Sequence, residues 1–178
     1  MAQFRAPEFL ASLADQAGPR HLDDDMEMVA DTFASFAANV IAPHAEHVHR
    51  TNGDVPEEIV TGLAEIGAFG LSVPAEYGGP EIDPVTMVEA IATVAHADGA
   101  AGWCSMIAST TSSMAAFLPP ETAREIYGDP TAITGGVFAP NGKGVAASVD
   151  GRAGFSVTGR WAWGSGTQHC RWVLGGSL

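Results

Sequence analysis

Basic residues are scarce in this sequence. Its 178 residues include 8 lysines and arginines against 21 aspartates and glutamates, which gives a formal charge of −13. Proteins that follow a nucleic-acid backbone or lie on an anionic membrane need clustered lysine and arginine to meet the phosphates. The charge balance therefore argues against both kinds of partner. The acidic excess is expected mainly to support solubility.

Cysteines and long apolar runs are also few. Cys104 and Cys170 are the only cysteines, too few for a disulfide framework or a zinc site, and they fit a reducing cytoplasm. The segment Met1–Pro7 lacks the apolar core of a signal peptide, so the same cytoplasmic location is expected. Residues 100–118 are uncharged, but six serines and threonines among them predict a buried small-residue helix rather than a membrane span.

Helical patterns dominate residues 1–130. The acidic run Asp23–Asp25 suits the positive end of a helix dipole, and the apolar residues after it recur at helical spacing until Pro43 interrupts or kinks the helix. His44 and His47 would share a helical face, but no acid or cysteine completes a ligand set, so we expect a solvated helix end and no metal site. Further helices are expected over residues 54–67, 83–97, 100–118 and 121–127.

Strand patterns replace the helical ones after Pro130. We expect an α+β chain, with a helical domain over residues 1–130 and part of a β domain over residues 131–178. Because the strand pattern is still running at Leu178 and a small sheet leaves unpaired edges, we expect either further chain or a neighbouring chain there. The predicted strands, with a turn at Asp150-Gly151, span residues 131–139, 144–149, 154–158, 161–163 and 170–175.

An aromatic stretch near the end of the chain is the most informative motif. Within residues 159–172, Trp161, Trp163 and Trp172 surround the small run Gly164–Gly166, whose one side chain is the hydroxyl of Ser165. A flat aromatic wall beside a small-residue turn suits a flat ligand with a polar edge, such as a flavin ring. A buried pair of aromatic strands is the alternative interpretation.

Two motifs resemble the acyl-CoA dehydrogenase superfamily. One is the helix end and loop over residues 63–79, which closes with Pro-Ala-Glu-Tyr-Gly-Gly. The other is Gly159–Ser165, which is similar to the strand that lines the flavin in that superfamily. The resemblance covers nearly the whole chain. It implies an N-terminal helical domain followed by the beginning of a β-barrel-like middle domain, with the C-terminal helical bundle of the family absent from these 178 residues.

A departure from the family pattern points to one branch of the superfamily. Members that oxidise acyl-CoA carry a Thr-Glu-Pro run, whereas this chain has Phe138–Lys143, Phe-Ala-Pro-Asn-Gly-Lys, at the corresponding place. This run, the Gly102-Trp103 pair and the stretch Gly159–Trp172 resemble the oxygenase components of two-component flavin-dependent monooxygenases. Those enzymes take reduced FAD or FMN from a separate reductase. The resemblance implies hydroxylation of a small aromatic or polycyclic substrate with O2.

The resemblance also assigns roles to individual residues. Ser165 would hydrogen-bond the flavin N5 atom, Trp163 would pack along the flavin ring, and Trp103 would line the substrate side of the site. A plain turn serine and ordinary core tryptophans are the structural alternatives. The base is unknown and would lie beyond Leu178. The implied cofactor-binding residues are Val137, Phe138, Ala139, Pro140, Trp163, Gly164 and Ser165.

Two other functions stay open at this point. One is an FAD-dependent acyl-CoA dehydrogenase that performs α,β-dehydrogenation, and the other is a truncated, non-catalytic helical interaction module. The family resemblance implies a homotetramer assembled through the C-terminal bundle, and the 178-residue piece alone is expected to be inactive. Strand periodicity places His169 on a different stretch from Ser165, so we expect it to contact a phosphate or a neighbouring subunit rather than act as a base.

Overall fold

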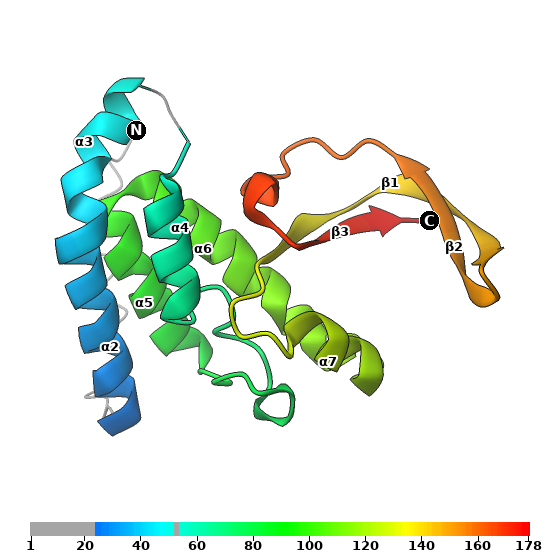
Figure 1. Ribbon diagram of the computed structural model, residues 1–178, viewed down its shortest axis with the longest axis horizontal. Coiled ribbons are helices and arrows are strands. Elements are labelled where there is room, and N and C mark those ends of the chain that lie inside the picture. The colour runs from blue at the N-terminus through cyan, green and yellow to red at the C-terminus, as the bar shows by residue number, and fades with distance from the viewer. Residues whose placement is uncertain (1–23, 52–53) are drawn as a thin grey trace, which may run out of the picture.

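The computed structural model describes residues 24–51 and 54–178. Helices fill the part before residue 131, and a small sheet stands beside them (Figure 1). The part of the predicted helical domain before Asp24 lies outside the described residues. The helical elements are α2 (Asp24–Phe36), the π-helical turn η1 (Ala37–Ile41), α3 (Ala42–Thr51), α4 (Glu57–Glu65), the 3-10 turn η2 (Ala75–Tyr77), α5 (Pro84–Ala97), α6 (Gly99–Ser112), the 3-10 segment η3 (Ser113–Phe117) and α7 (Pro120–Tyr127).

Side-chain caps define where the two central helices begin. The Asp83 carboxylate accepts hydrogen bonds from the amides of Val85 and Thr86, and Pro84 occupies the first turn of α5, where no amide donor is needed. The Asp98 carboxylate accepts from the Ala101 amide in the same way at the start of α6. These caps satisfy amides that would otherwise have no partner, which is why both helices start within one residue of the predicted positions.

Other helix boundaries differ from the expected ones. The helix that Pro43 was expected to interrupt or kink is not interrupted there, because it runs through the π-helical turn η1 directly into α3. Proline has no backbone N–H to donate, and a widened turn accommodates the missing hydrogen bond without ending the helix. The helix expected over residues 54–67 is α4, which starts later, at Glu57, and ends at Glu65. The helix expected over residues 100–118 is α-helical only to Ser112 and then tightens into η3.

The core of the helical part is built around α4, α5 and α6. Leu63 and Val94 are almost completely buried in it, together with Phe33 from α2. Helix α6 lies against this core through small residues, and the hydroxyl of Ser109 donates to the Ala68 carbonyl at 2.6 Å. The predicted buried small-residue helix is therefore confirmed. Among the described residues, no helix is long and apolar enough to cross a membrane.

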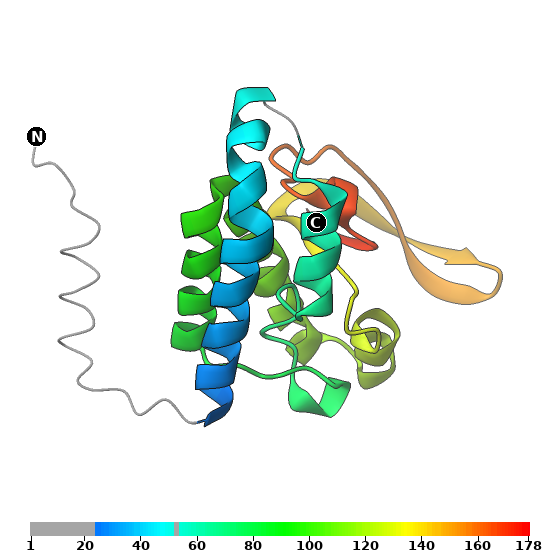
Figure 2. The same ribbon diagram turned by 60° about the vertical axis from the view of Figure 1, so that its left-hand side comes forward.

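The sheet has three strands: β1 (Thr134–Val149), β2 (Arg152–Gly159) and β3 (Trp172–Ser177), in the order β2-β1-β3. Strands β1 and β2 form an antiparallel hairpin that extends away from the helices (Figure 2). Strand β3 pairs with β1 in parallel, with an irregularity between Val137 and Gly142. The turn at Asp150-Gly151 was predicted correctly, whereas residues 131–139 and 144–149 were expected as separate strands and belong largely to one strand, β1.

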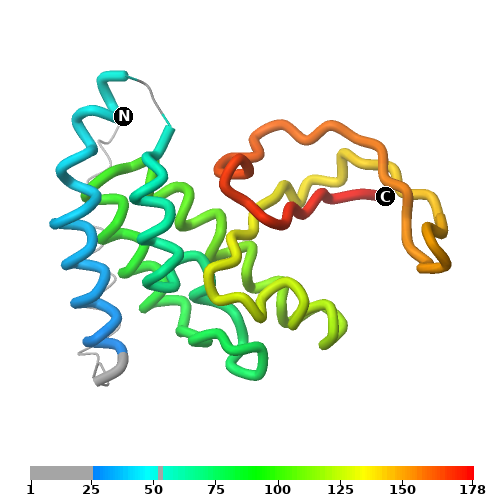
Figure 3. The backbone as a smooth tube through the Cα atoms, viewed as in Figure 1, coloured from blue at the N-terminus to red at the C-terminus, as the bar shows by residue number. Residues whose placement is uncertain are grey.

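The segment between β2 and β3 is a loop rather than the strand predicted over residues 161–163. The chain follows this loop from the sheet back to the helices before β3 begins (Figure 3). Trp163 has a left-handed backbone with φ of 66°, which a strand cannot accommodate. Two contacts of Arg171 hold the end of this loop beside the helical part. The Arg171 amide donates to the Ile133 carbonyl at 2.9 Å, and the Arg171 guanidinium lies 3.1 Å from the Asp129 carboxylate.

A glycine allows the close packing of α5 and α6. At Gly102 an added Cβ would overlap the backbone and side chain of Ala95, whereas at Gly99, three residues earlier in α6, it would meet nothing within 4 Å. We predict that Gly102→Ala lowers the free energy of unfolding by about 1–3 kcal/mol, because the helices must move apart.

The matched variant Gly99→Ala should raise the free energy of unfolding by a few tenths to about 1 kcal/mol, because alanine favours the helix and meets no neighbour. Urea unfolding followed by circular dichroism measures both variants. Equal effects of the two substitutions would show that the contact with Ala95 does not limit this packing.

Candidate functional site

The indole of Trp161 covers the point where all three strands approach one another. Its Nε1 donates to the Gly176 carbonyl at 2.8 Å. A Cβ added to Gly142 of β1, Gly159 of β2 or Gly175 of β3 would stand 2.5, 2.7 or 3.0 Å from the indole ring. The absence of side chains at these three positions leaves a slot that the ring fills. Trp161 therefore fixes the place where the chain leaves the sheet.

The tryptophan loop, residues 160–171, then folds on itself through short hydrogen bonds. The Ser165 amide donates to the Trp163 carbonyl at 2.9 Å, and the Thr167 hydroxyl donates to the Gly164 carbonyl at 2.7 Å. A 3-10 turn, η4 (Thr167–His169), closes the loop. Trp163 is 92% exposed in this arrangement, and Ser165 lines a space on the helical side of the loop. The loop therefore presents an aromatic face outward on a fixed backbone.

An open groove runs along the sheet beside the loop. Its volume of about 550 Å³ is in the range of small-molecule sites. It brings together two of the predicted flavin contacts, Val137 from β1 and Gly164 from the tryptophan loop, and Trp161 lies between them in its wall. The other lining residues are Gly136, Val157, Thr167, Val173, Leu174 and Gly175.

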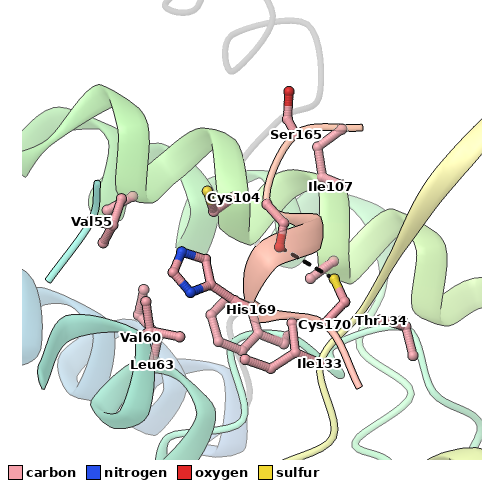
Figure 4. Close-up of a pocket in the computed structure, with 14 residues that line it drawn as sticks. Val55, Val60, Leu63, Cys104, Ile107, Ile133, Thr134, Ser165, His169 and Cys170 are labelled. Carbon is pink, nitrogen blue, oxygen red and sulfur yellow. Dashed lines mark hydrogen bonds between the residues drawn. The ribbon is translucent and has the colours of Figure 1, made fainter. Parts of the chain in front are cut away.

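A second, smaller space lies on the helical side of the loop. It has a cavity volume of about 10 Å³, between α4, α6 and η4. Ser165, His169 and Cys170 contribute to its wall from the loop, and Cys104 contributes from α6 (Figure 4). The Cys170 thiol donates to the Gly166 carbonyl at 3.4 Å, the dashed line in Figure 4. The loop thus rests on the helices through a mostly apolar interface.

The two cysteines at this interface are weakly acidic. Burial, with a smaller contribution from the neighbouring Cys104, raises the pKa of the Cys170 thiol to about 11. Burial raises the pKa of the Cys104 thiol as well, and the Asp98 carboxylate adds to that shift. Both groups are therefore thiols near neutral pH, and a thiol is a much weaker nucleophile than a thiolate. Both side chains are only partly buried.

The remaining predicted residues lie outside these two spaces or at their edges. Phe138 is 57% exposed on β1, and Ala139 and Pro140 beside it are exposed too. Trp103 is 54% exposed on α6, next to Cys104. The alternative interpretation of Trp163 and Trp103 as buried core tryptophans is therefore wrong. In residues 24–51 and 54–178, no group of three histidines, cysteines and acids is placed to hold a metal ion.

The structure corrects the placement of His169 and adds residues that the sequence did not reveal. Strand periodicity put His169 on a different stretch from Ser165, but the region is a turn, and both residues line the same cavity. The role of Trp161 and its three glycines was missed, because the glycines come from three separate strands. Only the register of the sheet places them under one ring.

The loop has the chemical features that a flavin ring requires. Trp163 offers an open aromatic face, and the Ser165 hydroxyl has no hydrogen-bond partner among the described residues. A flavin ring is flat and apolar on its faces and carries hydrogen-bonding atoms at its edge, so it can use both groups. The residues present therefore fit this cofactor.

Comparisons with known proteins agree with the fold. The family model for the acyl-CoA dehydrogenase N-terminal domain matches residues 23–124. The HsaA oxygenase subunit of a flavin-dependent monooxygenase from Rhodococcus jostii is 36% identical over 126 residues, 70% of this chain and 32% of that protein. The (2S)-methylsuccinyl-CoA dehydrogenase of Cereibacter sphaeroides is 37% identical over 126 residues, 65% of this chain and 23% of that protein.

Solved structures show the same relationship. The HsaA monooxygenase from M. tuberculosis aligns with a TM-score of 0.73 at 30% identity, covering 85% of this chain and 39% of that chain. XiaF from Streptomyces sp., in complex with FADH2 and glycerol, aligns with a TM-score of 0.73 at 25% identity, covering 84% of this chain and 37% of that chain. The chain spans about a third of the length of the monooxygenase subunits it matches. Its helices, its sheet and the match over residues 23–124 show that the chain belongs to the acyl-CoA dehydrogenase family.

Proposed function

We propose that this chain is part of the oxygenase component of a two-component flavin-dependent monooxygenase. Such an enzyme hydroxylates a small aromatic or polycyclic substrate with reduced FAD or FMN and O2. The observation that carries the proposal is the tryptophan loop, where an exposed Trp163 and an unpartnered Ser165 hydroxyl stand on a backbone fixed by Trp161. Support comes from relatives named as oxygenase subunits of flavin-dependent monooxygenases and as indole-3-acetate monooxygenase.

The chain's own residues would act by binding and orienting. Trp163 would stack on one face of the flavin ring, and the Ser165 hydroxyl would hydrogen-bond N5 at its edge. Val137, Phe138, Ala139, Pro140 and Gly164 would complete the contacts to the ring. Bound reduced flavin supplies the two electrons with which one oxygen atom of O2 enters the substrate and the other leaves as water.

Substrate and protein partners belong to the same proposal. Trp103, on the exposed side of α6, would form a wall of the substrate site. A separate flavin reductase would deliver the reduced cofactor, and the base would come from outside these 178 residues. We further propose a homotetramer in the cytoplasm, with the chain divided into a helical domain over residues 1–130 and a flavin-binding β domain from residue 131.

Acyl-CoA dehydrogenation is the second candidate. The similarity to (2S)-methylsuccinyl-CoA dehydrogenase specifically favours it. One experiment on the full-length protein distinguishes the two reactions. A dehydrogenase with bound FAD is bleached by an acyl-CoA without oxygen, whereas the oxygenase is not bleached and hydroxylates its substrate when reduced flavin and O2 are supplied. Failure to bind any flavin would exclude both enzymes and support a non-catalytic interaction module.

Replacement of Trp163 tests the stacking role without disturbing the fold. Because the side chain is 92% exposed, Trp163→Leu should change the free energy of unfolding by less than about 0.5 kcal/mol. We predict that the dissociation constant for reduced flavin rises about tenfold, the value of one aromatic stacking contact. Phe155→Leu, on the exposed hairpin, is the matched control and should leave flavin affinity unchanged. Equal affinities in all three proteins would contradict the stacking role.

Replacement of Ser165 tests the hydrogen bond to N5. We predict that Ser165→Ala lowers the fraction of reduced flavin used for hydroxylation by about threefold to tenfold, the value of one hydrogen bond. Hydrogen peroxide should rise correspondingly, because O2 is still reduced without reaching the substrate. Product and peroxide are measured together in the full-length enzyme. Ser156→Ala, an exposed serine of β2, is the control, and a peroxide yield equal to that of the parent in Ser165→Ala would reject the assignment.

A further inference from the structure

His169 lies between a cavity and a groove that are lined mostly by different residues. It lines the small cavity that Ser165 also lines, and it lines a groove of about 470 Å³ along α4. Val60 of α4 and Ile133 before β1 are the other residues common to both linings. The partition between cavity and groove therefore consists of these three side chains.

The two spaces differ in chemical character. The cavity of about 10 Å³ is surrounded mainly by apolar side chains of α4 and α6, and it could admit little more than one water molecule. The groove is open to solvent and carries the carboxylates of Glu57 and Glu65 together with Gln168. His169 thus stands between the solvent of the groove and the cavity that Ser165 also lines.

The ring of His169 contributes shape rather than polar contacts. Its Nε2 is buried and has no hydrogen-bond partner among the described residues. In Figure 4 the imidazole lies between Val60 and Cys104, while the Ser165 hydroxyl points away from it. A ring of similar size without nitrogen could fill the same space.

We propose that the imidazole of His169 closes the cavity behind Ser165 against the solvent groove along α4, and that its volume alone is sufficient for this. The closure is a property of the apoprotein. Its value for catalysis rests on the proposed function, because water that reaches the flavin loop would favour release of peroxide over hydroxylation.

The cysteines of the cavity report the closure directly. Cys104 and Cys170 both line the cavity and are the only cysteines of the sequence, so each labelling event can be assigned. Their raised pKa values make the basal reaction slow. Methyl methanethiosulfonate is small enough to follow water, and its rate of reaction at each cysteine is read by peptide mass spectrometry on the full chain without flavin.

The closure predicts a pattern across variants. His169→Ala should raise the labelling rate of Cys104 and Cys170 severalfold, because removal of the ring adds a path from the groove to both partly buried thiols. His169→Phe should label at about the parental rate. Gln168→Ala is the matched control, because Gln168 is exposed and lines the groove but is not in the cavity wall. Urea unfolding of each variant separates local access from global unfolding.

Two outcomes would overturn the proposal: unchanged labelling in His169→Ala, or labelling in His169→Phe as fast as in His169→Ala. If the alanine variant does not fold, His169→Val takes its place, with a smaller increase in labelling expected and no increase contradicting the closure.

The proposed function is tested separately with reduced flavin in the full-length enzyme. There His169→Ala should release more peroxide per product, and His169→Phe should match the parent. Loss of hydroxylation in His169→Phe despite parental labelling would assign proton transfer to His169 and reject a role by volume alone. Increased labelling in a protein that binds no flavin would leave the closure standing and reject the monooxygenase.

Discussion

The site depends on one packed side chain, the indole of Trp161. The ring lies on Gly142, Gly159 and Gly175, one glycine from each strand, and its Nε1 is held by the Gly176 carbonyl. A Cβ at any of the three glycines would approach the ring to 3.0 Å or less, so the strands can pair in this register only with the backbone bare beneath it. The same contact sets the direction in which the chain leaves β2.

The direction in which the chain leaves β2 determines which side chains of the tryptophan loop face solvent. With Trp161 fixed on the sheet, Trp163 takes a left-handed backbone and its side chain stands in solvent. A left-handed tryptophan is a strained conformation that persists only where surrounding contacts hold it, and here the turn bonds of Ser165 and Thr167 do so. At the far end, Arg171 is bonded to Ile133 and Asp129. The loop is thus held at both ends, one on the sheet and one on the helical part.

Local chemistry explains which features could be predicted from the sequence. Asp83 and Asp98 cap helices through contacts within three residues, and Asp150-Gly151 forms its turn by itself, so these were predictable. The strand prediction over Trp161–Trp163 was wrong because Trp-Ala-Trp alternates in side-chain size as a strand often does. Its real conformation is set by glycines that are distant in the sequence. Whether the predicted flavin contacts bind the cofactor could be inferred only from the family resemblance, since no local rule connects Val137 with Gly164.

The position of His169 follows from the same long-range geometry. Ser165 and His169, four residues apart, line the same cavity because the chain between them turns at η4, and this turn lies against α4 and α6. One short segment therefore has two faces, with the aromatic face of Trp163 toward solvent and the ring of His169 toward the helices. In the proposed partition Val60 of α4 stands beside His169, so α4 contributes to the wall behind the loop without touching a ligand.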